Sequence, residues 1–241
     1  MSCFRLQQCV IHTGAEFDSF LPFMERLPEV FTSGEGEPLY KGRNELRLLR
    51  YQGVELVVKS FQIPNWVNRI AYGLLRSSKA QRSFEYAERL QQIGIGTPQP
   101  IGYYTERKGL LFHRSYYVSR RSICPYTFAD LIQQPFTEEG AILQAIAQTT
   151  AQLHEQGLLH KDYSRGNILF ALTEKGVHVE IIDLNRIRFK QINWEEGCRN
   201  FERLPLTDRM LTILTKSYAQ ARGFDEKLCL RWMEKHHTNR L

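Results

Sequence analysis

Hydrophobic and polar residues alternate along this chain in two ways, and the first of them predicts strands. Five short runs rich in apolar residues are typical of strands: residues 4–11, 44–51, 54–61, 101–105 and 115–119. The second and third runs are joined at Gln52-Gly53, a pair that indicates a tight hairpin. The first half of the chain is therefore predicted to form a sheet.

The second pattern places apolar residues at every third or fourth position, which predicts helices. It occurs in residues 15–31, 80–93, 137–156, 210–218 and 227–236. Pro22 is tolerated because it lies near the first turn of the first of these helices. A chain of 241 residues with this mixture of elements can form one domain or two lobes that share a cleft.

The composition is typical of a soluble globular protein, with 42% hydrophobic and 24% charged residues. No apolar run approaches the roughly 20 residues of a membrane span, and the first ten residues lack the pattern of a secretion signal. The five cysteines are scattered and form no Cys-x-x-Cys pair, which favours reduced thiols over a zinc site. We therefore expect a cytoplasmic protein.

The net charge of +6 comes from one part of the chain, because residues 41–89 hold ten Lys or Arg against four Glu. The basic residues interleaved with Trp66 and Tyr72 are Arg43, Arg69, Arg76, Lys79 and Arg82. We expect this segment to make peripheral contact with an anionic membrane surface, at the inner face of the cytoplasmic membrane, or with an acidic glycolipid. The alternative is an ordinary solvated basic face. Nucleic acid is not an expected partner, since no recognition motif accompanies the charge.

Residues 158–185 carry the strongest chemical signal, with Asp162, Asn167 and Asp183 in that order. A loop that offers a carboxylate and, five residues later, a carboxamide is followed here by an apolar strand that ends in a second carboxylate. Such a layout can hold Mg²⁺ against nucleotide phosphates and leave the first carboxylate for an acceptor hydroxyl. His160 is expected to support the loop through backbone hydrogen bonds. The stretch predicts phosphoryl transfer.

Upstream of this stretch lie weaker candidates. Gly34, Gly36 and Gly42 interrupt the hydrophobic pattern between the first helix and the hairpin, where glycines most often form simple turns. Lys59 lies in a strand whose apolar neighbours indicate burial. Glu85 and Glu88 lie one turn apart on the following helix, so either carboxylate can pair with a strand lysine.

Together these elements resemble the lipopolysaccharide kinase family that includes the Kdo kinases, a branch of the protein-kinase-like superfamily. The resemblance covers roughly residues 40–185. It rests on HKDYSRGNILF and the IIDLN that follows it, on Lys59, and on KAQRSFEYAERLQQIGIGTPQPIGYY. It implies a two-lobed α+β fold with ATP in the cleft. The small β-rich N-lobe is expected at residues 1–119 and the helical C-lobe at residues 120–241.

The resemblance also implies roles for individual residues. Asp162 would orient the acceptor hydroxyl, and Arg165 would assist the transferring phosphate as a cation. Asn167 and Asp183 would hold Mg²⁺. Lys59 would bind the α and β phosphates of ATP.

Glu85 is the expected partner of Lys59, although Glu88 is not excluded. A loop containing Gly34, Gly36 and Gly42 would close over the phosphates. The expected acceptor is a sugar hydroxyl of the lipopolysaccharide inner core, on Kdo or heptose, or of a related glycolipid.

Several positions depart from the protein-kinase pattern. Ser164 stands where lysine is usual, and Leu184-Asn185 replaces Phe-Gly, with Asn185 expected to allow a left-handed turn. No Ala-Pro-Glu segment follows, which disfavours a peptide acceptor. The alternatives are a small-molecule or protein kinase of the same superfamily, and a pseudokinase that binds nucleotide without turnover.

Overall fold

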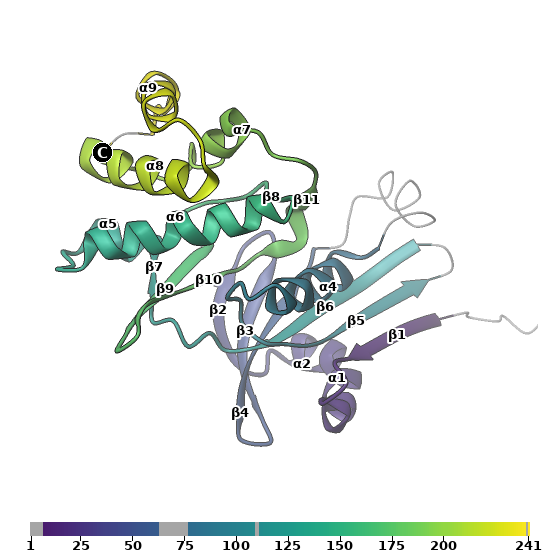
Figure 1. Cartoon of the computed structure of the whole chain (residues 1–241). Coiled ribbons are helices and arrows are strands. Elements are labelled where there is room, and N and C mark those ends of the chain that lie inside the picture. Colours follow the sequence, from purple (N-terminus) through teal and green to yellow (C-terminus); the bar gives the residue numbers. More distant parts are fainter. Residues whose placement is uncertain (1–6, 63–76, 109–110, 240) are drawn as a thin grey trace, which may run out of the picture. The chain divides into compact units, whose positions relative to one another are not determined.

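The computed structural model describes residues 7–62, 77–108, 111–239 and 241 (Figure 1). The chain forms two compact units. The N-terminal unit comprises Met1–Arg89 and Pro98–Arg121, and the C-terminal unit comprises Leu90–Thr97 and Ser122–Leu241. Most of the basic segment expected to contact a membrane, including Trp66, Arg69, Tyr72 and Arg76, lies outside the described residues.

The N-terminal unit is built on a six-stranded antiparallel sheet with the order β1-β5-β6-β4-β3-β2. Its strands are β1 (Gln7–Thr13), β2 (Glu37–Lys41), β3 (Glu45–Tyr51), β4 (Val54–Ser60), β5 (Pro100–Lys108) and β6 (Leu111–Arg120). The predicted hairpin is confirmed, since β3 and β4 pair along their whole length and both Gln52 and Gly53 have positive φ. Positive φ at both turn residues matches the right-handed twist of the two strands.

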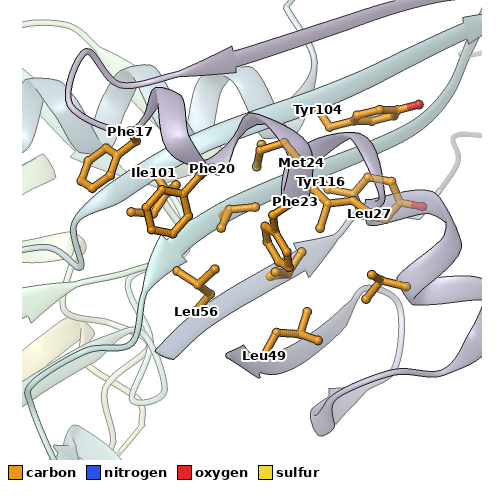
Figure 2. Close-up of a cluster of buried hydrophobic side chains, with 13 residues drawn as sticks. Phe17, Phe20, Phe23, Met24, Leu27, Leu49, Leu56, Ile101, Tyr104 and Tyr116 are labelled. Carbon is orange, nitrogen blue, oxygen red and sulfur yellow. The ribbon is translucent and has the colours of Figure 1, made fainter. Parts of the chain in front are cut away.

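The two faces of this sheet pack against different helices, because successive side chains of a strand point to opposite faces. On one face, Leu56, Val58 and Tyr116 join the aromatic residues that follow β1 in a buried cluster (Figure 2). On the other face, Phe61 and Tyr103 pack against Phe84 of helix α4 (Lys79–Gln92). Both faces of the central strand β4 are therefore covered, as its apolar sequence predicts.

The helix predicted over residues 15–31 is wrong as a single helix. The segment forms a short 3₁₀ turn (Asp18–Phe20), α1 (Leu21–Glu25) and α2 (Leu27–Ser33). Pro22 and Pro28 each stand in the first turn of one α-helix, where the missing N–H has no partner to lose. Pro28 would break a continuous helix, so the chain restarts at Leu27. The apolar spacing is preserved across the break, because Phe20, Met24 and Leu27 are all buried.

Arg47 ties the end of α2 to the sheet. Its side chain is only 10% exposed and forms an ion pair with Glu45. Its Nη1 donates to the carbonyl oxygens of Gly34 at 2.5 Å and Glu35 at 3.0 Å. These carbonyls belong to the chain reversal between α2 and β2, so one buried guanidinium satisfies the backbone of a segment that has no ladder of its own.

The C-terminal unit is mainly helical and also contains small antiparallel sheets. Its helices are α5 (Phe128–Gln133), α6 (Glu139–Glu155), α7 (Trp194–Arg199), α8 (Asp208–Arg222) and α9 (Glu226–His236). Its strands are β7 (Tyr126–Thr127), β8 (Leu158–His160), β9 (Ile168–Thr173), β10 (Gly176–Ile181) and β11 (Ile187–Phe189), with a 3₁₀ turn at Leu184–Arg186. They form one sheet of order β10-β9-β7 and one of order β11-β8. The sequence predicted an α+β fold with a β-rich N-lobe and a helical C-lobe, and the two units have this content.

Helix α6 is the centre of this unit. Its buried stripe includes Ile142, Ile146 and Leu153, as the periodicity predicts. The segment Leu90–Thr97 joins the same unit, because Ile181 donates its backbone N–H to the carbonyl of Gly96 at 2.9 Å. Among the described residues, no helix is both long and apolar enough to cross a membrane.

Replacing Arg47 by Met should destabilise the N-terminal unit. The change leaves the Gly34 and Glu35 carbonyls and the Glu45 carboxylate without their donor, which should cost about 3 kcal/mol of unfolding free energy. Hydrogen exchange at the β3 and β4 amides in increasing urea measures this. Arg50→Met is the matched control, because Arg50 is in the same strand but 79% exposed. Equal losses in both variants would contradict the role given to Arg47.

Candidate active site

A two-stranded pairing positions the loop that carries Asp162. β8 and β11 are antiparallel, with His160 opposite Ile187. Asp162 follows β8 and Arg186 precedes β11, so both emerge at the same end of the pair. Tyr163, directly after Asp162, is fully buried, and its hydroxyl is 2.6 Å from the Thr150 Oγ1 of α6. The loop is thus anchored on both sides of Asp162.

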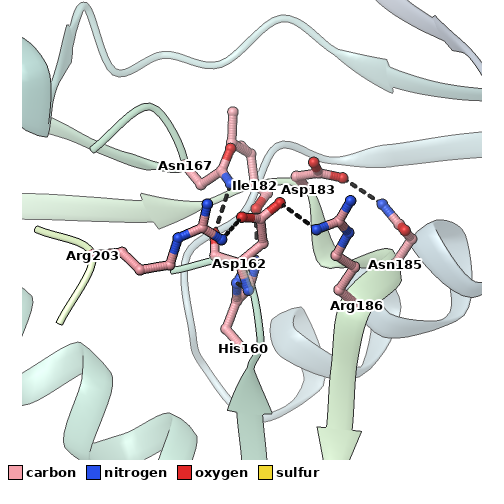
Figure 3. Close-up of polar contacts among 8 residues, drawn as sticks. All are labelled: His160, Asp162, Asn167, Ile182, Asp183, Asn185, Arg186 and Arg203. Atoms are coloured by element: carbon pink, nitrogen blue, oxygen red, sulfur yellow. Dashed lines mark hydrogen bonds and ion pairs between the residues drawn. The ribbon is translucent and has the colours of Figure 1, made fainter. Parts of the chain in front are cut away.

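His160 joins the two segments that hold the candidate aspartates. Its Nδ1 accepts the backbone N–H of Asp162 at 3.2 Å, and its Nε2 donates to the carbonyl of Ile182 at 3.1 Å (Figure 3). This pattern requires the neutral ring, and burial lowers the pKa of His160 in agreement with it. The prediction that His160 supports the loop through backbone hydrogen bonds is confirmed.

The Asp162 carboxylate lies between two arginines (Figure 3). Arg203 Nη1 bonds to Oδ1, and Arg186 Nη1 lies 3.1 Å from Oδ2. The Asp162 side chain is 16% exposed, whereas the two arginines are 56% and 51% exposed. Both oxygens of this carboxylate therefore face a cation in the structure.

Asn167 and Asp183 emerge from the same end of the β9–β10 hairpin, because Ile168 pairs with Ile181 and the Ile182 N–H donates to the Asn167 carbonyl. Asn167 Nδ2 donates to the backbone carbonyl of Asp162 at 2.8 Å, so its amide oxygen is the atom it can offer to a cation. Asp183 adds a carboxylate. Hard oxygen donors of this kind fit Mg²⁺.

Asp183 has a left-handed backbone, with φ 59° and ψ 48°. The left-handed residue was expected at Asn185, and that expectation is wrong. Asn185 instead lies in the 3₁₀ turn, where its Nδ2 donates to Asp183 Oδ1. Aspartate is one of the few non-glycine residues that adopt this conformation at small cost.

A buried polar chain reaches the Asp162 loop from α8. The Tyr218 hydroxyl is 2.7 Å from His154 Nδ1, and His154 Nε2 is 2.9 Å from Asn200 Oδ1. Asn200 Nδ2 donates to the carbonyl of His160 at 2.9 Å. For Asn200 to accept, His154 Nε2 must carry the proton. Burial lowers the pKa of His154 to about 4, so the ring is neutral and the chain is satisfied.

In the N-terminal unit, Lys59 stands in a row of polar and aromatic side chains across the sheet. It pairs with Tyr117 of β6, which pairs with Tyr103 of β5. The Lys59 Nζ lies 5.3 Å from the centre of the Phe61 ring. This row is on the face that α4 covers, since Tyr103 and Phe61 pack against Phe84.

The two candidate glutamates of α4 differ in position. Glu85 is exposed and accepts a hydrogen bond from Gln81 at 2.8 Å. Glu88 is half-buried. Burial of the two tyrosines is the main cause of the raised pKa of Tyr103 and of Tyr117, and the charge of Glu88 raises both further. The charge of Glu85 contributes for Tyr103 only. Of the two, Glu88 is therefore the carboxylate whose charge acts on Tyr117, the strand neighbour of Lys59.

The three glycines expected in one phosphate-binding loop do not share a loop. Gly34 ends α2 with φ 77°, and Gly36 follows with φ 85°, while Gly42 lies beyond β2 in the turn to β3. A side chain at Gly36 would meet the Leu49 side chain at 2.6 Å, so this glycine is required for packing. The expectation of a single loop is wrong because β2 separates them. Of these three glycines, only Gly42 occupies a hairpin turn.

The remaining predicted residue, Arg165, is exposed three positions after Asp162, and its carbonyl accepts the Ala129 N–H. Arg186 and Arg203 were not among the residues predicted from the sequence. Arg186 lies three residues after Asp183, so its nearness to the second aspartate was the available signal. Arg203 lies 41 residues after Asp162, and no spacing rule connects them.

Comparison with protein families supplies a match over residues 42–221, to the model described as the lipopolysaccharide kinase (Kdo/WaaP) family. That match covers most of the chain. The chain belongs to the lipopolysaccharide kinase (Kdo/WaaP) family. The resemblance seen in the sequence is confirmed, and Asp162, Asn167 and Asp183 all fall within the matched residues.

Curated relatives of this family member include 3-deoxy-D-manno-octulosonic acid kinases. One from Vibrio vulnificus (strain YJ016) is 28% identical over 137 residues, which covers 53% of this chain and 56% of the relative. One from Mannheimia succiniciproducens is 27% identical over 139 residues, which covers 57% and 56%. The chain spans about half the length of the curated relatives it matches.

Solved structures confirm the two-lobed kinase-like α+β fold that was predicted for this family member. WaaP in complex with acyl carrier protein matches with a TM-score of 0.65 at 16% identity, covering 94% of this chain and 97% of WaaP. Rio2 kinase from Chaetomium thermophilum, solved as an ADP/Mg²⁺-phosphoaspartate complex, matches with a TM-score of 0.50 at 14% identity, covering 91% of this chain and 69% of Rio2.

The free energy of unfolding should decrease as the pH is lowered, because of His154. Its pKa is about 4 when folded, against 6.5 for the free side chain, so the unfolded state takes up the proton first as pH falls. The contribution is complete above pH 6.5 and is lost between pH 6.5 and pH 4, amounting to about 3 kcal/mol. Urea unfolding at a series of pH values measures it.

The matched variants for this experiment are His154→Gln and His236→Gln. His154→Gln should lower stability at pH 7.5 but flatten its decline towards pH 4. His236 is exposed at the end of α9, so its replacement should leave the pH dependence of stability the same as in the wild type. Parallel curves for wild type and His154→Gln would show that another group causes the decline.

Proposed function

We propose that this protein transfers the γ-phosphoryl group of ATP to a sugar hydroxyl of the lipopolysaccharide inner core. The observation that carries the proposal is the convergence of Asp162, Asn167 and Asp183 on one loop system, held together by His160. Family membership supports the reaction class, and the names of the curated relatives support a sugar-acid acceptor.

Asp162 acts on the acceptor in this proposal. One carboxylate oxygen accepts the hydrogen bond of the attacking hydroxyl and takes its proton late in the transfer. The acceptor oxygen forms a bond to the γ-phosphorus while the bond from that phosphorus to the β–γ bridging oxygen breaks. The products are the phosphorylated sugar, ADP and a proton. Arg165, exposed on the same loop, is available as a cation for the transferring group.

Asn167 and Asp183 are the proposed holders of Mg²⁺. The ion would neutralise charge on the phosphate oxygens during transfer. Asn167 is held with its amide oxygen available, because its Nδ2 is bonded to the Asp162 carbonyl. Asp183 is held by its left-handed backbone and by Asn185. Two oxygen donors for the ion therefore come from the same end of the β9–β10 hairpin.

Lys59 is proposed to bind the α and β phosphates, with Glu88 as its partner. Glu85 was the choice from sequence, but it is exposed and bonded to Gln81. The effect of Glu88 on Tyr117, the strand neighbour of Lys59, supports the alternative that the sequence left open. Gly42 is the glycine proposed to lie over the phosphates.

Asp162→Asn should abolish phosphoryl transfer and leave nucleotide binding close to that of the wild type, because the metal donors are untouched. Asp183→Asn should instead weaken binding of ATP in the presence of Mg²⁺. Transfer from γ-labelled ATP to a Kdo-containing lipid A precursor, with a protein mixture and a sample without acceptor in parallel, measures the first effect. Calorimetry with ATP and Mg²⁺ measures the second.

The outcomes of the labelling experiment separate the candidate functions. Label on the glycolipid that disappears in Asp162→Asn supports the proposal. Label on protein would favour a protein kinase instead. Magnesium-dependent ATP binding without label on any acceptor would favour a nucleotide-binding scaffold. Near-normal turnover by Asp162→Asn would overturn the role of that residue.

Glu88→Gln should lower kcat/KM for ATP by about 10-fold or more, since removal of a charge partner loses a charge-assisted hydrogen bond. Glu85→Gln is its matched control on the same helix and should change kcat/KM less than 3-fold, as expected for an exposed charge. Initial rates at varied ATP concentration measure both. The reverse order of effects would restore Glu85 as the partner.

A further inference from the structure

Arg186 and Arg203 are the one pair of cations on the Asp162 carboxylate among the described residues, and they reach it from different segments (Figure 3). Arg186 ends the 3₁₀ turn after Asp183, and Arg203 follows α7. Each presents only its Nη1 to Asp162. A guanidinium has five N–H donors, so each arginine retains donors, and each side chain is about half exposed.

Both arginines are held in place by the fold. Arg186 precedes Ile187, which pairs with His160, so the β8–β11 ladder directs it towards Asp162. Arg203 lies three residues after Asn200, whose side chain bonds to the His160 carbonyl and to His154. The same buried network that holds the Asp162 loop therefore holds the segment that carries Arg203.

This arrangement affects the proposed role of Asp162. In the structure each carboxylate oxygen faces one guanidinium, which competes with an acceptor hydroxyl for that oxygen. One carboxylate between two guanidiniums also leaves a surplus of one positive charge. An acceptor that brings its own anion would neutralise this surplus, and a second carboxylate could take up guanidinium donors and so lessen their competition for Asp162.

We propose that Arg186 and Arg203 form the subsite that binds the carboxylate of a sugar-acid acceptor. This inference rests on the proposed function and goes further, because it selects an acidic sugar such as an octulosonic acid over a neutral heptose. The planar fork of a guanidinium matches a carboxylate through two parallel hydrogen bonds. An anion in this position would also orient the sugar relative to Asp162.

The test uses an alkyl glycoside of 3-deoxy-D-manno-octulosonic acid and the methyl ester of the same glycoside. Both probes lack phosphate, so discrimination between them reports on the carboxylate alone. Wild-type enzyme should prefer the acid by about 10- to 100-fold in kcat/KM, the range expected for charge-assisted hydrogen bonds. Arg203→Ala and Arg186→Ala should each lose most of this preference, mainly through KM for the acceptor.

Three comparisons make the result specific. Arg203→Lys should recover part of the preference, because it keeps the charge and loses the fork. Arg199→Ala is the matched control from the same segment: Arg199 pairs with Glu202 at 3.5 Å and does not contact Asp162, so the preference should be unchanged. KM for ATP should stay within about 3-fold of the wild type in all variants, as expected for residues that bind only the acceptor.

The inference is overturned if the arginine variants reduce turnover of acid and ester equally, which would make the arginines holders of Asp162. It is also overturned if dependence on the arginines appears only with a phosphorylated lipid A precursor, which would make phosphate the anion. Calorimetry of the binding of the two glycosides tests the carboxylate subsite independently of phosphoryl transfer. If no acceptor is phosphorylated, arginine-dependent binding of the acid over the ester still supports the subsite, whereas equal binding rejects it.

Discussion

The site depends on one neutral histidine. His160 accepts from the backbone of Asp162 and donates to the backbone of Ile182, the residue before Asp183. A single buried ring therefore fixes the distance between the two segments that carry the candidate aspartates. A protonated ring could not accept from Asp162, so the low-dielectric surroundings that lower the pKa of His160 also maintain the link.

The histidine is supported in turn by a chain of residues distant in sequence. Asn200 bonds to the His160 carbonyl, and His154 and Tyr218 continue the network to α8, where Arg222 donates to the Tyr218 hydroxyl at 3.0 Å. Every member has its partner, which is the condition under which a buried polar network specifies one arrangement. The C-terminal helices thus take part in positioning the Asp162 loop, even though they contribute no candidate catalytic residue.

The sequence allowed much of this to be predicted, and the failures have physical causes. Strong periodicity gave α4, α6, α8 and α9 and the β3–β4 hairpin, since each of these elements buries one face or forms around a distinctive turn. The family resemblance rested on Lys59, a helical glutamate, Asp162, Asn167 and Asp183 in that order, together with the sequence around them. Short elements such as α7, β8 and β11 were missed because three to six residues show no period. The split of the first predicted helix was missed because the helix-breaking effect of Pro28 was not considered. The separation of the three glycines was missed because residues 37–41 were not predicted to form a strand.

The contact between Arg203 and Asp162 could not be predicted from a sequence motif. Asp162 is 41 residues away from Arg203, and only the Asn200 network and the end of α7 bring the two together. In the proposed reaction, the two sets of cations have different tasks. Lys59 and a metal held by Asn167 and Asp183 would neutralise nucleotide phosphate, whose charge is common to every kinase reaction. Charge on the acceptor differs from one kinase to another, so cations beside Asp162 answer a different requirement. Arg186 and Arg203 flank the carboxylate that is proposed to meet the acceptor. A kinase for an anionic sugar needs positive charge at that place, and a kinase for a neutral sugar does not.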